Sequence, residues 1–274
     1  MYETYWGLRE KPFENTPDPR FYYASEQHRE ACGRLLYCVR ERKGAGLLSG
    51  VFGCGKTIVA RVLLQELNQE RYRTALLTNP RVNDLDFLRM LAHRLGHPAP
   101  PAGKADILIV LEQLVGDNAK EGRDTVIVVD EAHAIEDAAV FEEMRLLLNL
   151  QQHDRFLVTL LLLGQPELAS LVEQDKPLEQ RIAVKAHLTA MTLEETRDYV
   201  THRLRVAGHP QPETVFTPEA FPMIYESTGG VPRRINRLCD ICLLAGMGAQ
   251  VRALDAVLVA DEVKTLRPAA AAGQ

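Results

Sequence analysis

The sequence predicts an α/β fold, in which helices cover both faces of a parallel sheet, followed by a small domain made only of helices. Short apolar strands alternate with helical segments between residues 47 and 188, and this alternation is typical of a buried parallel sheet. After Thr189 the strand patterns stop and only helical patterns remain. A glycine-rich loop joins the first strand to the next helix. These three observations set the fold class.

The expected α/β domain spans residues 25–190 and follows an irregular lead-in, residues 1–24, that is rich in proline and aromatic side chains. Ser25 is a suitable cap for its first helix. The expected strands cover residues 47–49, 74–78, 125–129, 156–163 and 183–188. The expected helices cover residues 26–42, 57–67, 85–95, 107–115, 138–150 and 166–172.

The second domain is expected over residues 191–267. Thr192 and Glu195 have the spacing of a capping box, so a helix should follow them and run to Val206. Further helices are expected at 218–226, 232–244 and 254–266, and the alanine-rich residues 268–274 are expected to form a flexible tail.

Composition indicates a soluble, cytoplasmic, globular protein. Hydrophobic residues make up 46% and charged residues 25% of the 274 residues, which argues against disorder. The chain has five cysteines, an odd number in a protein large enough to fold without disulfides, so reduced thiols are expected. Neither a signal peptide nor a run of about 20 apolar residues for a membrane span is found. The net charge of −5 provides no global attraction to nucleic acid.

The loop after the first strand carries the strongest functional signal. It fits the phosphate-binding pattern GxxxxGK[ST], in the strand-to-helix context that gives this pattern its meaning. Its glycines let backbone N–H groups surround phosphate oxygens, while Lys56 adds a cation and Thr57 a hydroxyl for Mg²⁺. The alternative, a glycine-rich turn with a chance lysine, is disfavoured by the flanking strand and helix. The expected nucleotide-binding residues are Gly50, Val51, Phe52, Gly53, Cys54, Gly55, Lys56, Thr57 and Ile58.

Two acidic residues follow the apolar strand at 125–129. Asp130 would hold Mg²⁺ through its water shell, and Glu131 would polarise the attacking water. Gln165 ends the next strand along the chain and could sense the γ-phosphate, although a glutamine in a turn is an equal alternative.

Three further polar residues stand at element ends. Arg233 opens a helix of the second domain and could reach the nucleotide, or it could be part of a solvated helix start. Arg181 precedes the last strand, and composition alone favours a surface ion pair there. Asn79 closes a strand, as asparagines commonly do in turns.

Together, these residues resemble AAA+ ATPases of the P-loop NTPase class, and more closely the ExeA/GspA-like group. That group includes predicted ATPases of type II secretion, MSHA-type pilus and PEP-CTERM/exosortase loci. The resemblance covers nearly the whole chain. The motifs that carry it are Trp6-Gly7-Leu8, Lys11-Pro12-Phe13, Pro17-Asp18-Pro19-Arg20-Phe21, the phosphate loop, Thr78-Asn79-Pro80, Asp130-Glu131-Ala132-His133, Gly164-Gln165-Pro166, Gln180-Arg181-Ile182 and Gly229-Gly230-Val231-Pro232-Arg233.

The resemblance implies a sheet of order 5-1-4-3-2 with a helical lid domain. It implies that Gln165 is the sensor-1 residue, Arg233 the sensor-2 arginine and Arg181 an arginine finger that acts on the ATP of a neighbouring subunit. It also implies that Asn79 restrains the catalytic glutamate and that residues 19–23 border the adenine. His133 departs from the family, where glutamine is commoner, and Phe52 and Cys54 replace the usual valine and threonine.

The resemblance implies an ATP-hydrolysing motor or switch that uses ATP and Mg²⁺ and serves a secretion, pilus or exopolysaccharide assembly system. Its expected partners are further copies of itself, in a hexamer or another ring or filament, and proteins of the assembly machinery. Such partners could hold it at the inner membrane. The alternatives are a DNA-associated ATPase that regulates transposition and a nucleotide-binding switch with negligible turnover. A helicase is disfavoured because a second recombinase-like domain is missing.

Overall fold

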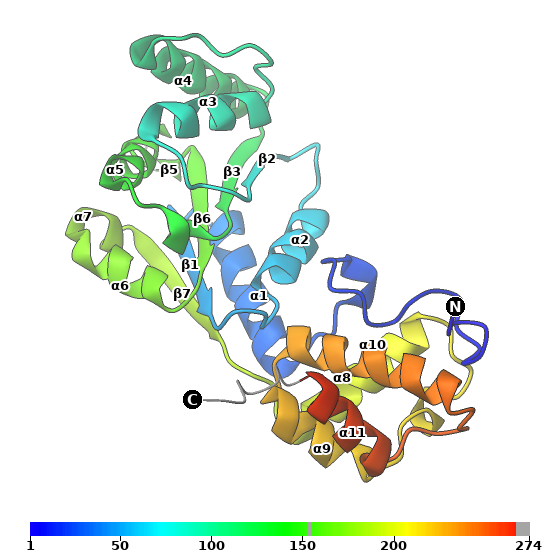
Figure 1. Cartoon of the computed structure of the whole chain (residues 1–274). Helices are drawn as coiled ribbons and strands as arrows, with labels where there is room; N and C mark the ends of the chain where they lie inside the picture. The colour runs from blue at the N-terminus through cyan, green and yellow to red at the C-terminus, as the bar shows by residue number, and fades with distance from the viewer. Residues whose placement is uncertain (153–154, 267–274) are drawn as a thin grey trace. The chain divides into compact units, whose positions relative to one another are not determined.

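The computed structural model describes residues 1–152 and 155–266 (Figure 1). Contacts within the chain divide it into two compact units. The α/β unit comprises Glu26–Phe52 and Lys56–Leu188, and the helical unit comprises Met1–Ser25, Gly53–Gly55 and the chain from Thr189 onward. The lead-in therefore belongs to the same compact unit as the C-terminal helices, a grouping that the sequence did not predict.

The α/β unit is built on a parallel sheet of five strands in the order β2-β3-β6-β1-β7. These five strands, numbered one to five along the chain, have the order 5-1-4-3-2 read from the β7 edge, so the expected topology is confirmed. The central strands are apolar and buried throughout, which explains their continuous hydrophobic sequence. The strands are β1 (Ala45–Gly50), β2 (Tyr72–Leu77), β3 (Asp124–Val129), β6 (Val158–Gly164) and β7 (Ile182–Leu188).

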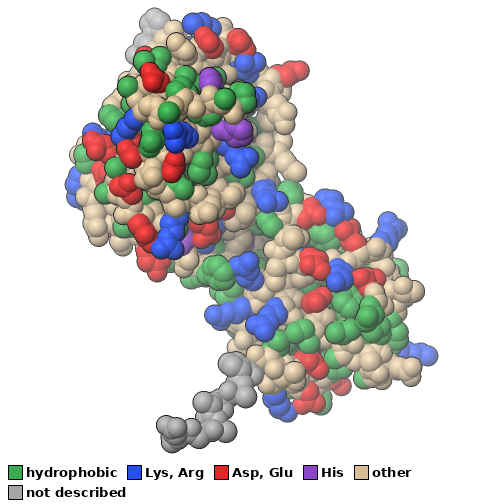
Figure 2. All heavy atoms as spheres, turned by 45° about the horizontal axis from the view of Figure 1, so that its top comes forward, with side chains coloured by type: hydrophobic (Ala, Val, Ile, Leu, Met, Phe, Trp, Pro, Cys, Tyr) green, Lys and Arg blue, Asp and Glu red, His purple; other side chains and the backbone are tan. Residues whose placement is uncertain are grey.

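Helices cover both faces of this sheet. α1 (Glu26–Arg40) and α2 (Lys56–Glu66) pack together on one face, and α5 (Ala138–Leu147), α6 (Glu167–Gln174) and α7 (Lys176–Glu179) lie on the other (Figure 1). α3 (Asp84–Arg94) packs against α4 (Lys104–Lys120), α5 and β2. On the face seen in Figure 2, acidic and basic side chains lie interspersed over this unit.

Several elements of the α/β unit differ from the sequence prediction. The strand expected from residue 156 begins at Val158, because Phe156 belongs to a short hairpin and pairs with Gln151. This hairpin consists of β4 (Gln151–Gln152) and β5 (Arg155–Phe156), and it was not predicted. α4 continues past Val115 to Lys120 because Gly116 meets open space and does not end the helix. The helix α7 was also missed.

The helical unit contains α8 (Leu193–Val206), α9 (Ala220–Thr228), α10 (Pro232–Gly248) and α11 (Ala256–Leu266), with short 3₁₀ turns at η1 (Pro19–Phe21) and η3 (Pro212–Thr214). The expected capping box is present: the Glu195 N–H donates to Thr192 Oγ1 at 3.1 Å and the Thr192 N–H donates to Glu195 Oε2 at 3.0 Å. The predicted tail, residues 268–274, lies outside the described residues.

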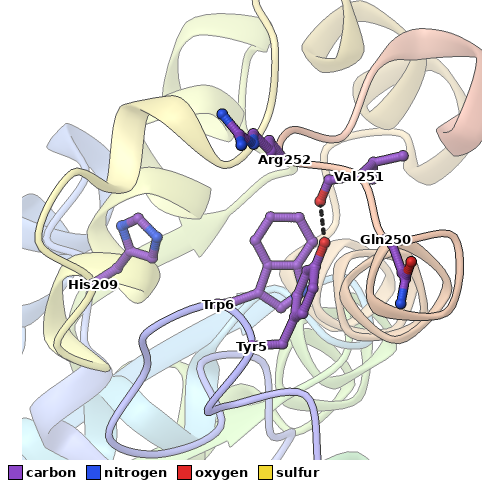
Figure 3. Close-up of a pocket in the computed structure, with 6 residues that line it drawn as sticks. All are labelled: Tyr5, Trp6, His209, Gln250, Val251 and Arg252. Atoms are coloured by element: carbon purple, nitrogen blue, oxygen red, sulfur yellow. Dashed lines mark hydrogen bonds between the residues drawn. The ribbon is translucent and has the colours of Figure 1, made fainter.

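The lead-in supplies a large part of the core of the helical unit. Its buried residues are Tyr2, Trp6, Leu8, Phe13 and Phe21. The Trp6 indole N–H donates to the Leu243 carbonyl at 2.8 Å, and Tyr5 donates to the Val251 carbonyl at 2.6 Å. Figure 3 shows both aromatic rings beside a pocket of about 440 Å³. None of the residues that line this pocket is among the predicted site residues.

All five cysteines are buried and free. Burial raises the pKa of Cys32 to about 11 and the pKa of Cys242 to about 12, so these thiols stay protonated. Across residues 1–152 and 155–266, no group of three or more His, Cys, Asp or Glu residues is arranged to hold a metal ion. Within the same residues, no helix has both the length and the apolar character that crossing a membrane requires.

Candidate nucleotide-binding site

The phosphate loop joins the end of β1 to the start of α2. Gly53 and Gly55 have φ angles of +84° and +104°, which lie in the left-handed region that favours glycine. Lys56 is 5% exposed, and its Nζ donates to the carbonyls of Gly50 at 2.8 Å and Val51 at 3.2 Å. The ammonium group is therefore held over the loop beside the start of a helix, where an anion is stabilised.

The variable positions of the loop point in different directions. The Cys54 side chain is fully buried, whereas Val51 and Phe52 are 39% and 58% exposed. Ile58 is half-buried in the first turn of α2. Because phosphate recognition in such loops uses backbone N–H groups, neither Phe52 nor Cys54 needs to contact a phosphate.

The acidic end of β3 reaches the first turn of α2. Thr57 Oγ1 donates to Asp130 Oδ2 at 2.6 Å, and the Asp130 side chain is nearly fully buried. The other oxygen, Asp130 Oδ1, accepts the Glu131 N–H at 2.9 Å. A hydroxyl and a carboxylate are hard oxygen ligands of the kind that Mg²⁺ prefers. The two side chains therefore fit a magnesium site.

Glu131 has an unusual backbone. Its φ and ψ of 56° and 32° place a non-glycine residue in the left-handed region, directly before the turn η2 (Ala132–Ala134). The turn is anchored because Ala132 is fully buried and Ile135 is 5% exposed. The Glu131 side chain is 39% exposed, whereas Asp130 is nearly fully buried. The carboxylate can thus meet water beside the buried aspartate.

Sequence reasoning left the role of His133 open, and the structure brings it next to two predicted residues. His133 Nε2 lies 3.5 Å from Glu131 Oε2 and 2.9 Å from the Gln165 amide nitrogen. His133 Nδ1 accepts the Gln165 backbone N–H at 3.3 Å. The end of β6 is thereby linked to the turn after β3. The one signal in the sequence that pointed to this residue was the histidine itself, because glutamine is commoner at this position in the family.

Within the described residues, no hydrogen bond joins Asn79 or Arg181 to this cluster. Asn79 is exposed, beyond the end of β2, and among the described residues no hydrogen bond joins it to Glu131. Arg181 precedes β7 and its carbonyl accepts the Ala45 N–H at 3.2 Å. In the register of the sheet, Ala45 pairs with Ile182 while Gly50 pairs with Leu188. Arg181 is therefore at the opposite end of β7 from the phosphate loop. Within the described residues, its guanidinium forms no ion pair.

Two predicted features fall in the helical unit. Arg233 is exposed at the start of α10, and its backbone N–H donates to the Gly53 carbonyl at 3.3 Å, a contact internal to this unit. Of the residues expected to border adenine, Phe21 is buried in the core and Tyr23 packs edge-on against Tyr199.

Comparisons with known proteins agree with this geometry. Residues 39–172 match the AAA domain family. The chain is 35% identical to General secretion pathway protein A of Aeromonas hydrophila, over 97% of this chain and 49% of that protein. The chain is a GspA-like AAA+ protein. It spans about half the length of this curated relative.

Solved structures share the fold of this GspA-like protein. The ORC2 protein of Aeropyrum pernix superposes with a TM-score of 0.69 at 19% identity, over 92% of this chain and 69% of that one. The RuvB Holliday junction branch migration motor of Thermotoga maritima gives a TM-score of 0.61 at 18% identity, over 88% of this chain and 69% of that one. Both likenesses concern the AAA+ fold, which is a nucleotide-binding fold.

Proposed function

We propose that this GspA-like protein is a magnesium-dependent ATPase that acts as a motor or switch for a secretion, pilus or exopolysaccharide assembly system. One observation carries the catalytic part of the proposal. The 2.6 Å hydrogen bond from Thr57 to Asp130 joins the phosphate loop to the acidic end of β3. A phosphate held by the loop would therefore lie beside the carboxylates that its hydrolysis requires.

The loop would bind the phosphates of ATP with its backbone N–H groups and with Lys56. The Lys56 Nζ already lies at hydrogen-bond distance from loop carbonyls, so a modest rotation would bring it to the β- and γ-phosphate oxygens. Arg233, at the start of α10, would add a second positive charge. The role of Asn79 as a restraint on Glu131 stays a prediction, since no hydrogen bond joins the two among the described residues.

Thr57 and Asp130 would hold Mg²⁺, which when bound offsets the negative charge of the phosphate oxygens. The Glu131 carboxylate would accept a proton from the attacking water, because it is solvent-accessible and stands one residue from the buried Asp130. Gln165, one strand away at the end of β6, would donate an amide N–H to the γ-phosphate side.

Arg181 would act on the ATP of a neighbouring copy rather than on its own. About six residues of β7 separate it from the strand end that faces the phosphate loop. At about 3.3 Å per residue this is roughly 20 Å, which exceeds the reach of an arginine side chain. A ring or filament of identical subunits, such as a hexamer, would bring Arg181 to a second active site.

The relative from Aeromonas hydrophila supports the secretion role, since it is named for the general secretion pathway. On this proposal the protein works in the cytoplasm and reaches the inner membrane through partner proteins. The alternative, a DNA-associated ATPase for transposition, has weaker support because the DNA-handling neighbours share only the fold and the net charge is −5. Salt-dependent binding to duplex DNA would favour the alternative.

The deciding experiment is titration of Lys56→Ala with ATP by calorimetry, in the presence of Mg²⁺. We expect ATP binding to be lost while the circular dichroism spectrum is unchanged, because Lys56 supplies a fixed charge to the loop. Lys120→Ala is the matched control, since Lys120 is 78% exposed on α4 and is paired only with Asp117 within the described residues. Wild-type affinity in Lys56→Ala would overturn the proposed site.

A further inference from the structure

One side chain outside the loop and the magnesium site contacts two expected active-site residues at once. His133 lies in the η2 turn and its side chain is 15% exposed. It faces the Glu131 carboxylate on one side and both the backbone and the side chain of Gln165 on the other. The imidazole therefore adds a side-chain link between the turn after β3 and the end of β6, two strands that already pair in the sheet.

We propose that His133 is a positioning residue that couples the proton-accepting Glu131 to the phosphate-facing Gln165. This inference rests on the proposed ATPase function and deepens it. Neither the phosphate loop nor the pair formed by Thr57 and Asp130 requires a histidine, so the roles proposed above assign no function to His133.

The proton of the imidazole explains how the coupling works. Nδ1 accepts the Gln165 backbone N–H, so the neutral ring carries its proton on Nε2. That proton faces two acceptors: Glu131 Oε2, and the Gln165 amide oxygen once the amide turns. The oxygen of a turned amide accepts a hydrogen bond from the His133 Nε2–H, and the NH₂ group of Gln165 then points away from the ring. With the His133 N–H held by Gln165, Glu131 keeps only its 3.5 Å contact to the ring and is free to act as a base, so the orientation of Gln165 governs the availability of Glu131.

The backbone around His133 is shaped for this contact. A side chain at Gly164 would lie 3.2 Å from the His133 backbone nitrogen and 2.8 Å from Leu168 Cδ2, so the end of β6 and η2 approach closely. The left-handed backbone of Glu131 begins the turn that brings the imidazole back over Gln165. Ala132, between the two residues, is fully buried and holds the turn in place.

The test compares three variants of the full chain that differ in the bonds they keep. His133→Phe keeps a ring but makes no hydrogen bond. His133→Asn keeps an acceptor near the Nδ1 position, and His133→Gln reaches the Nε2 position. We expect kcat to fall about 10- to 100-fold in the phenylalanine and asparagine variants, as for other residues that orient active-site groups. The glutamine variant should recover most of the rate, and ATP affinity and melting temperature should stay unchanged in all three.

A double-variant comparison separates coupling from an additive effect. If Gln165 acts through His133, Gln165→Ala combined with His133→Phe should be no slower than the slower single variant. If the two losses in kcat multiply in the double variant, the coupling is refuted. Wild-type kcat in His133→Phe would also overturn it, as would equal losses in all three variants together with a matching drop in melting temperature.

A second readout does not depend on hydrolysis. Because the Gln165 N–H donates to His133 Nδ1, amide exchange at Gln165 should be several-fold faster in His133→Phe than in the wild type and close to wild type in His133→Asn. Unchanged exchange in His133→Phe would refute the link. A wild-type protein that lacks ATPase activity but shows this exchange pattern would refute the proposed function and leave the link standing.

Discussion

The α/β unit and the helical unit position their residues by different means. In the α/β unit, the central site residues directly follow a buried strand or open a helix, as Asp130 follows β3 and Lys56 opens α2. In the helical unit, contacts join the two ends of the sequence: Trp6 donates to Leu243, and Tyr2 donates to Asp240. The chemistry is thus set by neighbours along the chain, whereas the helical core depends on residues more than 200 positions apart.

This difference separates two kinds of vulnerability. A change at the end of a strand should alter function with little effect on the fold, because the strand itself stays buried. A change in the lead-in should weaken the helical unit, because no neighbouring segment can replace the lost contact. The predictions below test this separation, from the largest expected effect to the smallest.

The largest effect is expected at Arg181. An arginine that stabilises a transferring phosphoryl group contributes about 10³-fold or more to kcat, so Arg181→Ala should bind ATP normally and hydrolyse it about 10³-fold more slowly. Glu131→Gln should be similarly slow because it lacks the base. Mixing the two variants should restore activity, since a mixed assembly contains some sites with one intact Glu131 and one intact Arg181. Steady-state phosphate release measures all three samples.

A mixture that stays inactive, and activity per subunit that is constant on dilution, would show that Arg181 does not act between subunits. The α/β unit of each subunit would then hydrolyse ATP without a residue from a neighbouring subunit. Arg34→Ala is a suitable control for the loss of a surface arginine. The exposed Arg34 side chain donates to the Lys185 carbonyl and forms an ion pair with Glu30.

Trp6→Ala should destabilise the helical unit by about 3–5 kcal/mol, since a nearly fully buried indole and its hydrogen bond to Leu243 are both lost. Tyr5→Ala is the control because Tyr5 is 41% exposed, and it should cost about 1 kcal/mol. Hydrogen exchange resolved by peptide should show faster exchange in α8 and α10. Equal loss of protection in β3 and β6 would show that the two units unfold together, and would contradict the difference between them.

Lys104→Met tests contacts between helices in the α/β unit. Lys104 pairs with Asp84 and with Glu143, whose side chain is 5% exposed, so the variant leaves a buried carboxylate without its cation. We expect a loss of about 1–3 kcal/mol, below the usual cost of breaking a buried pair because Lys104 itself is 41% exposed. Urea unfolding followed by circular dichroism measures it. The control variant Lys120→Met should change the free energy of unfolding by less than about 0.5 kcal/mol. A loss in Lys120→Met equal to the loss in Lys104→Met would refute the stabilising role assigned to the pairing of Lys104 with Glu143.

The smallest effect concerns pH and the helical unit. Burial, together with Arg205 and Arg203, lowers the pKa of His202 below its ordinary value. The unfolded chain therefore binds a proton that the folded chain does not, and the free energy of unfolding should fall as pH falls from about 7 to 5. Fluorescence of the single tryptophan, which lies in this unit, can follow thermal unfolding. His202→Gln should flatten the dependence, whereas His93→Gln, at an exposed site, should not.

Local signals made the catalytic half of the molecule predictable. The five main strands, the phosphate loop and the carboxylates after β3 follow from apolar runs and spacing within a few residues. The lead-in was not predicted to join the helical core, because nothing near Trp6 indicates that Leu243 is its partner. The link from His133 to Gln165 was also missed, since it depends on how two strand ends meet. The hairpin β4–β5 is too short to produce a periodic pattern.

The backbone of Glu131 has a consequence for how this protein can evolve. A glutamate in the left-handed region costs about 1–2 kcal/mol relative to an ordinary backbone, and asparagine tolerates that conformation better. A single change to asparagine would relax the backbone and remove the proposed base, so on this proposal a more stable and inactive protein lies one substitution away. Selection for folding alone would favour that change. On the proposed function, a glutamate at this position reflects selection for turnover against selection for stability.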